Sequence, residues 1–537
     1  MPVRPLVWCA WAVAASLARL GAGEASGLPK GHVVFLADFD SSDALRAWSG
    51  RGAFGEGRRE GRSLFVHRAE GRAGATVVSA EIPAEALRGH TIRGYAWVRA
   101  EDVGEKPRPW NGIKFLLAIE TPGGTLWPQA PLPAGTFGWR RTGLTAAIPA
   151  DASAVRLVLG LEDVDGRAWF DDVKLIVAKP PRRPRPAPPE RPIAPVHGVS
   201  RLRGAMVSPS IDEEGLRTLG RDWNANAIRW QLVRHGVPGS VNSLQDYDRW
   251  LDGELEKLDR ALPHCEAYGL YVVVDLHSPP GGKATASGYY GSDHGLFLSP
   301  AAQEKFLEVW KKIARRYKDS VPVWAFDLAN EPVEDFVEED CDDWRDLAEK
   351  AARAIREIDP ERTIVVEAPP WGGPESLADF EPIDLPGIVY SAHMYVPHAF
   401  THQGVHRDSA RSYAYPGEIE GKTWDRDALE AALEPVVRFQ RTYRVPIYIG
   451  EFSAIRWAPE GSAYRYLEDA IAIFESHEWD WTYHAFREWH GWSVEHGEDR
   501  SELEPSPVPT EREKLLRAWF AKNEKPLWAK GRAEGRP

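Results

Sequence analysis

The chain has 537 residues, a formal net charge of −13 at pH 7 and 23 tryptophans. This length predicts two or three domains, each able to bury its own core. The acidic balance excludes the basic surface that nucleic acids or anionic membranes require, so neither is expected as a partner. Flat apolar rings suit sugars as well as protein cores, although most of the tryptophans are expected in cores.

Residues 1–25 have the features of a secretory signal peptide. Arg4 precedes an uncharged run from Leu6 to Ala18, and small residues follow it. The run is too short to span a membrane, which takes about 20 apolar residues. We therefore expect a secreted protein, extracellular or periplasmic. Beyond this segment only Cys265 and Cys341 remain, too few for a disulfide framework, and the sequence leaves open whether they pair.

Residues 28–178 read as an all-β domain. Glycine, proline and aspartate turns separate short strands expected at 32–39, 63–67, 75–82, 94–99, 113–120, 138–148, 154–162 and 167–177. This number and spacing predict a β-sandwich of the jelly-roll type. The stretch 166–175 resembles the closing strand of carbohydrate-binding jelly rolls, which implies a carbohydrate-binding-module-like domain. Trp110, Trp127 and Trp139 are then candidates for stacking on sugars, with core packing and a purely structural domain as the alternatives.

A proline-rich stretch, residues 179–195, follows this domain. Such a composition forms an extended, semi-rigid spacer, so a domain boundary is expected here. The second domain is expected to span residues 196–528, with a short tail at 529–537.

The second domain alternates apolar strands with amphipathic helices. Helices are expected at 301–317 and 344–358, where the apolar residues fall on one face. The expected strands are 203–207, 225–230, 270–276, 323–328, 363–367, 387–391, 445–449 and 481–486. Eight such units predict an α/β fold, a (β/α)8 barrel, rather than an open sheet.

Two of these strands end near a glutamate. Glu331 follows the strand at 323–328 in Asn-Glu-Pro, where Pro332 removes a backbone donor, and Glu451 follows a glycine at the end of the strand beginning at Val445. The carboxyl ends of barrel strands lie on one face, where such folds place their chemistry. Two carboxyl groups facing each other across a sugar are the working parts of most glycoside hydrolases, so the two glutamates are candidate catalytic residues.

Further polar or aromatic residues follow other strands of the barrel: Arg229, His277, Asn330, His393, Tyr395 and Trp489. Together with the two glutamates, Pro332 and Trp492, this set resembles glycoside hydrolase family 5, the large family of cellulases and mannanases, over about residues 196–525. The resemblance implies a retaining β-glycosidase with Glu331 as acid/base and Glu451 as nucleophile.

The remaining members of the set would bind the substrate or the nucleophile. Arg229 and Tyr395 would hold the oxygens of Glu451, and Asn330 would bond the sugar 2-hydroxyl. The two histidines would bond sugar hydroxyls or the acid/base, and Trp489 would lie under the reacting ring. No metal and no organic cofactor is needed for this chemistry.

Two features lie outside that set. His398, His402 and His406 are spaced four apart and would share a helix face as metal ligands, whereas Gly404 and the position after a strand favour a loop at the rim of the barrel. Trp371, after the fifth strand, is a candidate sugar platform, with packing as the alternative.

We expect a monomer that cleaves a polysaccharide or oligosaccharide, with internal cleavage of β-1,4-glucan as the leading hypothesis. Mannan, xyloglucan or another β-linked glycan is the alternative. Loops at the rim of the barrel select the substrate, and their specificity cannot be read from a single sequence. A hypothesis of another class is a catalytically inactive, secreted glycan-binding protein.

Overall fold

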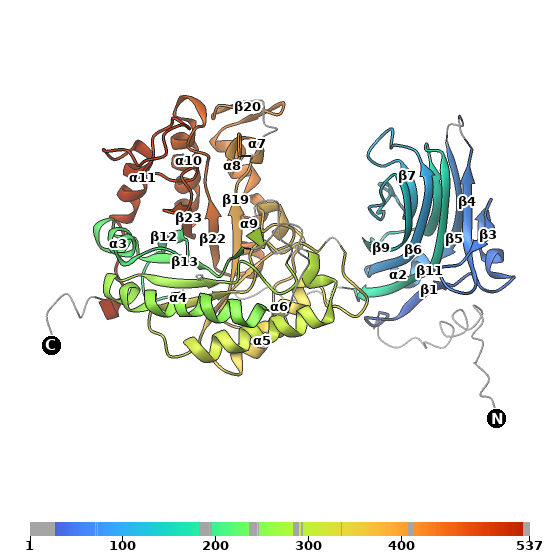
Figure 1. Ribbon diagram of the computed structural model, residues 1–537, viewed down its shortest axis with the longest axis horizontal. Coiled ribbons are helices and arrows are strands. Elements are labelled where there is room, and N and C mark those ends of the chain that lie inside the picture. Colours follow the sequence, from blue (N-terminus) through green and yellow to red (C-terminus); the bar gives the residue numbers. More distant parts are fainter. Residues whose placement is uncertain are drawn as a thin grey trace. The chain divides into compact units, whose positions relative to one another are not determined.

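The computed structural model describes residues 27–529 except 70, 72–73, 182–192, 194–195, 236–243, 245, 283–288, 291–293, 335 and 406–411. The chain divides into two compact units, Met1–Arg185 and Pro186–Pro537 (Figure 1). The predicted signal peptide, most of the predicted spacer and nearly all of the tail lie outside the described residues. Within the described part, none of the helices has the length and apolarity needed to cross a membrane.

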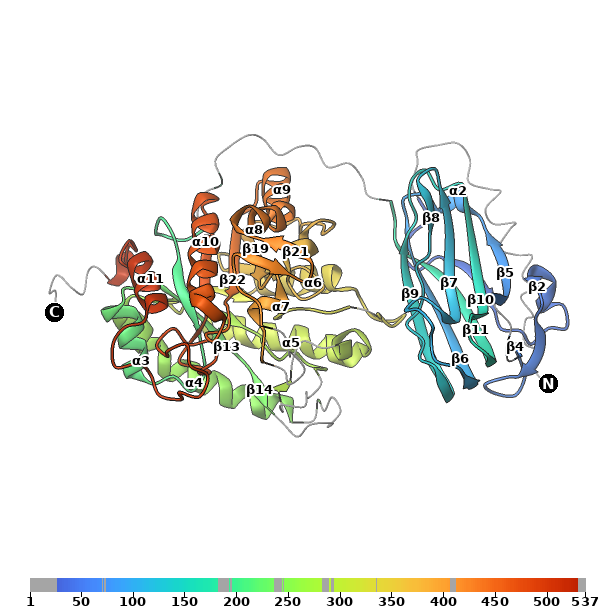
Figure 2. The ribbon, with the colours of Figure 1, turned by 90° about the horizontal axis from the view of Figure 1, so that it is seen from above.

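The N-terminal unit contains two antiparallel sheets (Figure 2). One consists of β1 (Val33–Ala37), β3 (Ala53–Glu56), β4 (Arg62–Arg68), β6 (Thr91–Val103), β9 (Gly135–Ala147) and β11 (Gly166–Lys179). The other has the order β2 (Ser49–Gly50), β5 (Ala75–Ile82), β10 (Ala154–Glu162), β7 (Gly112–Thr121) and β8 (Gly124–Leu126). Alternate residues of β10, such as Leu157 and Leu159, are fully buried in a core to which both sheets contribute, as the two-residue period of a strand requires.

The C-terminal unit is built on a closed barrel of eight strands, and every neighbouring pair is parallel. Around the barrel these are β12 (Arg203–Val207), β13 (Ala227–Gln231), β15 (Tyr271–Asp275), β17 (Val323–Asp327), β18 (Thr363–Glu367), β19 (Ile388–Met394), β22 (Ile447–Phe452) and β23 (Asp480–Phe486). Each lies within a few residues of a strand predicted from the sequence. The prediction of a (β/α)8 barrel is confirmed.

Helices pack around this barrel, chiefly α3 (Glu213–Arg217), α4 (Tyr247–Tyr268), α5 (Pro300–Tyr317), α6 (Trp344–Arg356), α9 (Glu434–Tyr443), α10 (Ser462–Ser476) and α11 (Glu511–Phe520). Local sequence fixes their ends. The Thr510 hydroxyl accepts a hydrogen bond from the Glu513 backbone at the start of α11, as its capping sequence predicts. Gly269 ends α4 with a left-handed φ of +67°, a conformation that glycine adopts without strain.

Shorter elements lie between these. They are α2 (Ala84–Leu87) in the N-terminal unit and, in the C-terminal unit, α7 (His398–Thr401), α8 (Arg426–Ala432), the pair β14 (Arg234–His235) and β16 (Tyr289–Tyr290), and the pair β20 (Gly417–Ile419) and β21 (Lys422–Trp424).

The segment after α11 is attached to the end of the barrel at which the strands begin. The Lys525 ammonium donates to the backbone carbonyls of Gly220, Ala225 and Tyr268 at 2.6, 2.6 and 3.0 Å. Asn523 donates to the carbonyls of Arg203 and Asn224, both at 3.0 Å. These bonds satisfy carbonyls at the first residue of β12 and in the segments that precede β13 and β15. The polar residues described next lie at the opposite end of the barrel.

Candidate active site

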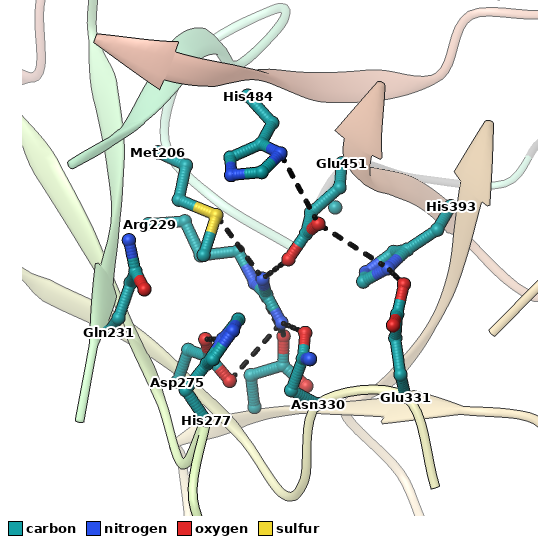
Figure 3. A network of polar contacts seen from close by, with 12 residues as sticks. Met206, Arg229, Gln231, Asp275, His277, Asn330, Glu331, His393, Glu451 and His484 are labelled. Carbon is teal, nitrogen blue, oxygen red and sulfur yellow. Dashed lines mark hydrogen bonds and ion pairs between the residues drawn. The ribbon is translucent and has the colours of Figure 1, made fainter. Parts of the chain in front are cut away.

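Charged side chains gather at the carboxyl ends of the barrel strands (Figure 3). They come from seven strands or the residues directly after them: Arg229, Asp275, Asp327, Glu331, Glu367, His393, Glu451 and His484. Most of them are less than 5% exposed. Burying a charge costs much free energy unless it is paired, so the contacts among these groups decide what the site can do.

The two candidate catalytic glutamates converge on His393. Its Nδ1 lies 2.9 Å from Glu331 Oε1 and 3.8 Å from Glu451 Oε2. One oxygen of each carboxylate and a nitrogen of His393 all lie within 4.8 Å of one another. Residues far apart in the sequence therefore face the same small volume, as the barrel topology predicts.

Arg229 is fully buried beneath this pair and holds one oxygen of Glu451, since Nη1 donates to Oε1 at 2.5 Å. The same guanidinium lies within 3.1 Å of three more carboxylates, those of Asp275, Asp327 and Glu367. Burial opposes its charge, but the four carboxylates keep the pKa of Arg229 well above its ordinary value. A permanently charged, five-donor group is thus fixed under the site.

The second oxygen of Glu451 accepts a hydrogen bond from the Tyr395 hydroxyl at 2.9 Å. Burial alone would raise the pKa of Glu451, but the positive charges of His393, His484 and Arg229 lower it well below its ordinary value. Glu451 is therefore anionic over the working range of most enzymes, with a donor on each oxygen.

Glu331 is shifted in the opposite direction. Burial raises the pKa of Glu331, and the negative charges of Glu451 and Glu367 add to this, whereas His393 opposes it. Two neighbouring carboxyl groups with opposite shifts form a protonated acid beside an ionised base or nucleophile.

Glu367, at the end of β18, contacts both the backbone of Glu331 and the side chain of His393. It accepts from the backbone N–H of Glu331 at 2.8 Å and lies 3.2 Å from His393 Nε2. Glu331 itself has a left-handed φ of +45°, which is uncommon for a residue with a side chain. A Cβ at residue 372 would lie 2.6 Å from Glu367 Oε2, so Gly372 allows the backbone to pass close to this carboxylate.

Asn330 and His277, two predicted substrate-binding residues, belong to the same network. Asn330 Oδ1 accepts from Arg229 Nη2 at 3.1 Å, so its NH2 group is directed away from the guanidinium. His277 Nδ1 lies 2.6 Å from Asp275 Oδ2, which fixes the orientation of the imidazole ring. Both side chains are buried at the mouth of the barrel.

Trp489, the remaining predicted residue, lies in a cluster of aromatic side chains. Its half-buried ring packs against Trp457 at 5.8 Å and Trp492 at 5.6 Å. Trp492, rather than Trp489, packs against Tyr395 and His484. The side chain of β23 that meets the nucleophile candidate is His484, 3.8 Å from Glu451 Oε2.

Sequence reasoning missed several members of this network, namely Asp275, Asp327, Glu367, His484 and Glu488. Three of them carried a usable signal, because Asp275, Asp327 and Glu367 each end an otherwise apolar, buried strand. A charge in such a strand costs free energy unless a partner meets it, so it indicates a buried ion pair.

The features outside the predicted set also have places in the structure. Trp371 is 58% exposed. Its backbone N–H donates to the Pro332 carbonyl at 3.2 Å, so the backbone of Trp371 lies close to the segment that carries Glu331. The rings of His398 and His402 stack at 3.9 Å, while His406 lies outside the described residues. Among the described residues, the group with the spacing of metal ligands is Glu331, His393 and Glu451. Cys265 and Cys341 are both buried.

A family model described as Cellulase (glycosyl hydrolase family 5) matches residues 193–493. The chain belongs to glycosyl hydrolase family 5. It is therefore a glycoside hydrolase, an enzyme that hydrolyses O-glycosyl bonds.

Relatives within the family carry names of enzymes that degrade glucans. Endoglucanase C of Acetivibrio thermocellus is 30% identical over 265 residues, which cover 44% of this chain and 74% of the relative. Cellodextrinase A of Ruminococcus flavefaciens is 25% identical over 262 residues, 48% of this chain and 73% of the relative. A solved structure of Thermotoga maritima Cel5A in complex with cellobiose aligns with a TM-score of 0.45 and 23% identity over 59% of this chain and 97% of that one.

Proposed function

We propose that this family 5 enzyme is a secreted retaining β-glycoside hydrolase that cleaves β-1,4-glucan internally. The observation that carries the proposal is that oxygens of Glu331 and Glu451 lie within 4.8 Å of each other. Retaining glycosidases hold their carboxyl groups about 5–5.5 Å apart, whereas inverting enzymes need about 6.5–9.5 Å to admit a water. The name of Endoglucanase C supports a β-1,4-glucan substrate.

In the first step Glu451 acts as the nucleophile and Glu331 as the acid. A Glu451 oxygen forms a bond to the anomeric carbon while the bond from that carbon to the glycosidic oxygen breaks. Glu331 gives its proton to the departing oxygen and becomes a carboxylate. The raised pKa of Glu331 and the lowered pKa of Glu451 supply the required protonation states.

In the second step water hydrolyses the glycosyl ester. Glu331, now a base, takes a proton from water, and the water oxygen forms a bond to the anomeric carbon as the bond to Glu451 breaks. Glu451 leaves with the electron pair as a carboxylate. Arg229 and Tyr395 stabilise the returning charge because each donates to one of its oxygens.

Asn330 is the group best placed to bind the sugar 2-hydroxyl. Its oxygen is already engaged by Arg229, so its NH2 group remains as the donor that faces away from the guanidinium. A bond to this hydroxyl strengthens as the sugar approaches the oxocarbenium-like transition state.

Two measurements test this mechanism. Proton NMR of the first product formed from an oligosaccharide is expected to show the β-anomer, and a 2-deoxy-2-fluoro glycosyl fluoride is expected to label Glu451. An α-anomer as first product, or a label on another residue, would overturn the retaining assignment. Assays on cellulose, mannan and xyloglucan would separate the leading substrate from its alternatives, and absence of turnover on all β-glycans would favour the binding-only hypothesis.

The N-terminal unit is proposed to bind carbohydrate through the edge of its five-stranded sheet. Trp110 precedes β7 and Trp127 follows β8, and the two rings are 54% and 59% exposed rather than packed in the core. Lys114, on the face of β7 that points away from the core, bonds the Trp110 carbonyl and lies 3.2 Å from Gln129 Oε1. It therefore joins the two loops that carry the exposed rings. Trp139 is half-buried.

Secretion and a monomeric state complete the proposal. The first rests on residues 1–25 of the sequence. N-terminal sequencing of the protein from the culture medium or periplasm is expected to find cleavage near residues 22–25, and light scattering is expected to give the mass of one chain. Retention in the cytoplasm with an intact N-terminus would overturn the proposed secretion.

A further inference from the structure

His484 lies beside the nucleophile candidate on the face away from the acid (Figure 3). Its Nδ1 is 2.5 Å from the Tyr395 hydroxyl and 3.8 Å from Glu451 Oε2. The side chain is 15% exposed, and its ring also packs against Trp492 at 5.7 Å. The imidazole is therefore held in one orientation, directed at the pair formed by Tyr395 and Glu451.

The direction of these hydrogen bonds follows from the single proton of the tyrosine. Tyr395 donates that proton to Glu451 Oε2 at 2.9 Å, since a carboxylate can only accept. Its oxygen must then accept from His484, which places a hydrogen on Nδ1. The three residues form a one-way chain from His484 through Tyr395 to Glu451.

The opposite edge of the imidazole faces a third carboxylate. His484 Nε2 lies 3.6 Å from Glu488 Oε2, and Gln231 of β13 donates to the same oxygen at 2.7 Å. Burial and Arg229 favour a neutral ring, but Glu451 and Glu488 outweigh them and raise the pKa of His484. Hydrogens on both nitrogens match the acceptors that both edges face.

We propose that His484 is a positioning residue for the nucleophile: it fixes the Tyr395 hydroxyl as a permanent donor to Glu451, and Glu488 and Gln231 hold it in place. This proposal rests on the proposed role of Glu451. Without a donor at residue 484, the hydroxyl hydrogen of Tyr395 is free to rotate toward other acceptors. Glu451 would then keep the hydrogen bond from Arg229 but lose the fixed one from Tyr395.

The two chemical steps respond differently to this loss. In glycosylation a charged Glu451 becomes an ester, so a donor on its oxygen stabilises the ground state as well. In deglycosylation the ester becomes a carboxylate, and a preorganised donor stabilises the charge that develops in the transition state. The inference therefore predicts a defect mainly in the second step.

The test compares His484→Leu, which removes the donor, with His484→Asn, whose amide nitrogen occupies roughly the position of Nδ1. The substrate is a 2,4-dinitrophenyl β-glycoside carrying the preferred sugar, because its good leaving group makes deglycosylation limit kcat. His484→Leu is expected to lower kcat on the order of 10- to 100-fold, with a much smaller change in kcat/KM and a burst of dinitrophenolate. His484→Asn is expected to recover most of the loss.

His477→Leu is the matched control, because its side chain is 16% exposed, like that of His484, stacks on Trp479, and has as its carboxylate neighbour Glu430 of α8, which is not part of the candidate site. It is expected to leave both parameters unchanged. If His484→Leu does not fold, Glu488→Gln provides a second test, since it keeps the bond from Gln231 but removes the charge behind the imidazole. It is expected to lower kcat in the same direction by a smaller factor.

Failure of this inference differs from failure of the proposed mechanism. A fluoro-sugar label on a residue other than Glu451 overturns the mechanism. A label on Glu451 together with equal losses of kcat and kcat/KM in His484→Leu, or with no loss, overturns the positioning role alone. Equal activities of His484→Leu and His484→Asn would do the same.

Discussion

The backbone amide of Glu331 donates to the carboxylate of Glu367 at 2.8 Å. The side chain of Glu331 meets His393, which Glu367 also contacts, at 3.2 Å. Glu367, from the neighbouring strand, therefore fixes the backbone of the proposed acid directly and its carboxyl group through His393. This arrangement explains how a residue with a left-handed backbone keeps one position at the end of a loop.

Glu367→Gln is expected to misplace the acid. A glutamine must turn an NH2 group toward Arg229 or toward the Glu331 amide, which leaves a buried donor facing a donor, at a cost of roughly 1–3 kcal/mol. Activity on unactivated oligosaccharides should fall much more than activity on dinitrophenyl glycosides, which need no proton on the leaving group. Glu375→Gln, an exposed carboxylate in the loop that follows β18, is the control. Equal losses on both substrates would argue against a specific effect on the acid.

His393→Asn is expected to move both limbs of the pH profile of kcat/KM to higher pH. The protonated imidazole stabilises the charged forms of Glu331 and Glu451, so its removal raises the pKa of each. The alkaline limb, where Glu331 loses its proton, and the acid limb, where Glu451 gains one, then shift in the same direction. Rate measurements across the pH range check this, with His477→Asn as the control. Limbs that move apart or downward would contradict the assignment.

Arg229→Met is expected to destabilise the barrel as well as abolish activity. It leaves four buried carboxylates without their common cation. Breaking a buried ion pair from one side costs about 3–5 kcal/mol. Urea unfolding measures this loss of stability. The unfolding transition of the barrel is identified as the one in which the wild-type enzyme loses its activity. Arg46→Met, at a side chain 81% exposed, serves as control. A stability equal to that of the wild type would show that the carboxylates are neutralised by other means.

Trp371→Ala is expected to weaken the use of long substrates. Its ring is exposed, and its backbone N–H donates to the carbonyl of Pro332, next to the proposed acid, so we expect the ring to border the leaving-group side of the site. Loss of a sugar stacked on this ring should cost about 0.5–1.5 kcal/mol in kcat/KM on long oligosaccharides. Dinitrophenyl glycosides, whose leaving group is small, should be unaffected. Trp127→Ala removes an equally exposed ring in the other unit and should change neither rate. A loss on both substrates would point to a packing role for Trp371.

The double variant Trp110→Ala and Trp127→Ala is expected to reduce retention on insoluble glucan while rates on soluble substrates stay unchanged. Aromatic faces supply most of the contact that a flat sugar ring can make. A pull-down with insoluble cellulose measures retention, and Leu36→Ala, at a residue 57% exposed in the same unit, is the control. Unchanged retention would leave the N-terminal unit with a structural role.

The order and number of the barrel strands were predictable because each strand is a short apolar run with a distinct boundary. The convergence of Glu331 and Glu451 was predictable for the same reason, since a parallel barrel brings all strand ends to one face. The sequence could not specify the register of the strands or the distances between their side chains. Whether two carboxyl oxygens lie within 4.8 Å depends on how far each strand extends, and Glu451 lies inside β22 rather than after it.

His484, a neighbour of Glu451 that the prediction of Trp489 did not include, shows the same limit. Both residues follow Trp481 within a few positions, and an aromatic ring at the strand end is the natural expectation for a sugar-binding site. The strand β23 extends to Phe486 and carries His484, which lies 3.8 Å from Glu451 Oε2, while the place of Trp489 under a sugar ring stays a prediction. A histidine in an apolar strand gives no sign of its partners until the fold brings Tyr395 and Glu488 to it.

The bonds made by Asn523 and Lys525 bear on how much of the polypeptide the catalytic unit needs. The family match stops at residue 493, yet these two side chains bond the first residue of β12 and the segments that precede β13 and β15. A fragment that ends at residue 493 would lose these hydrogen bonds, while it would keep the residues of the candidate active site. Such a fragment is expected to unfold first at the end of the barrel where the strands begin, while the geometry of the candidate active site at the opposite end is still intact.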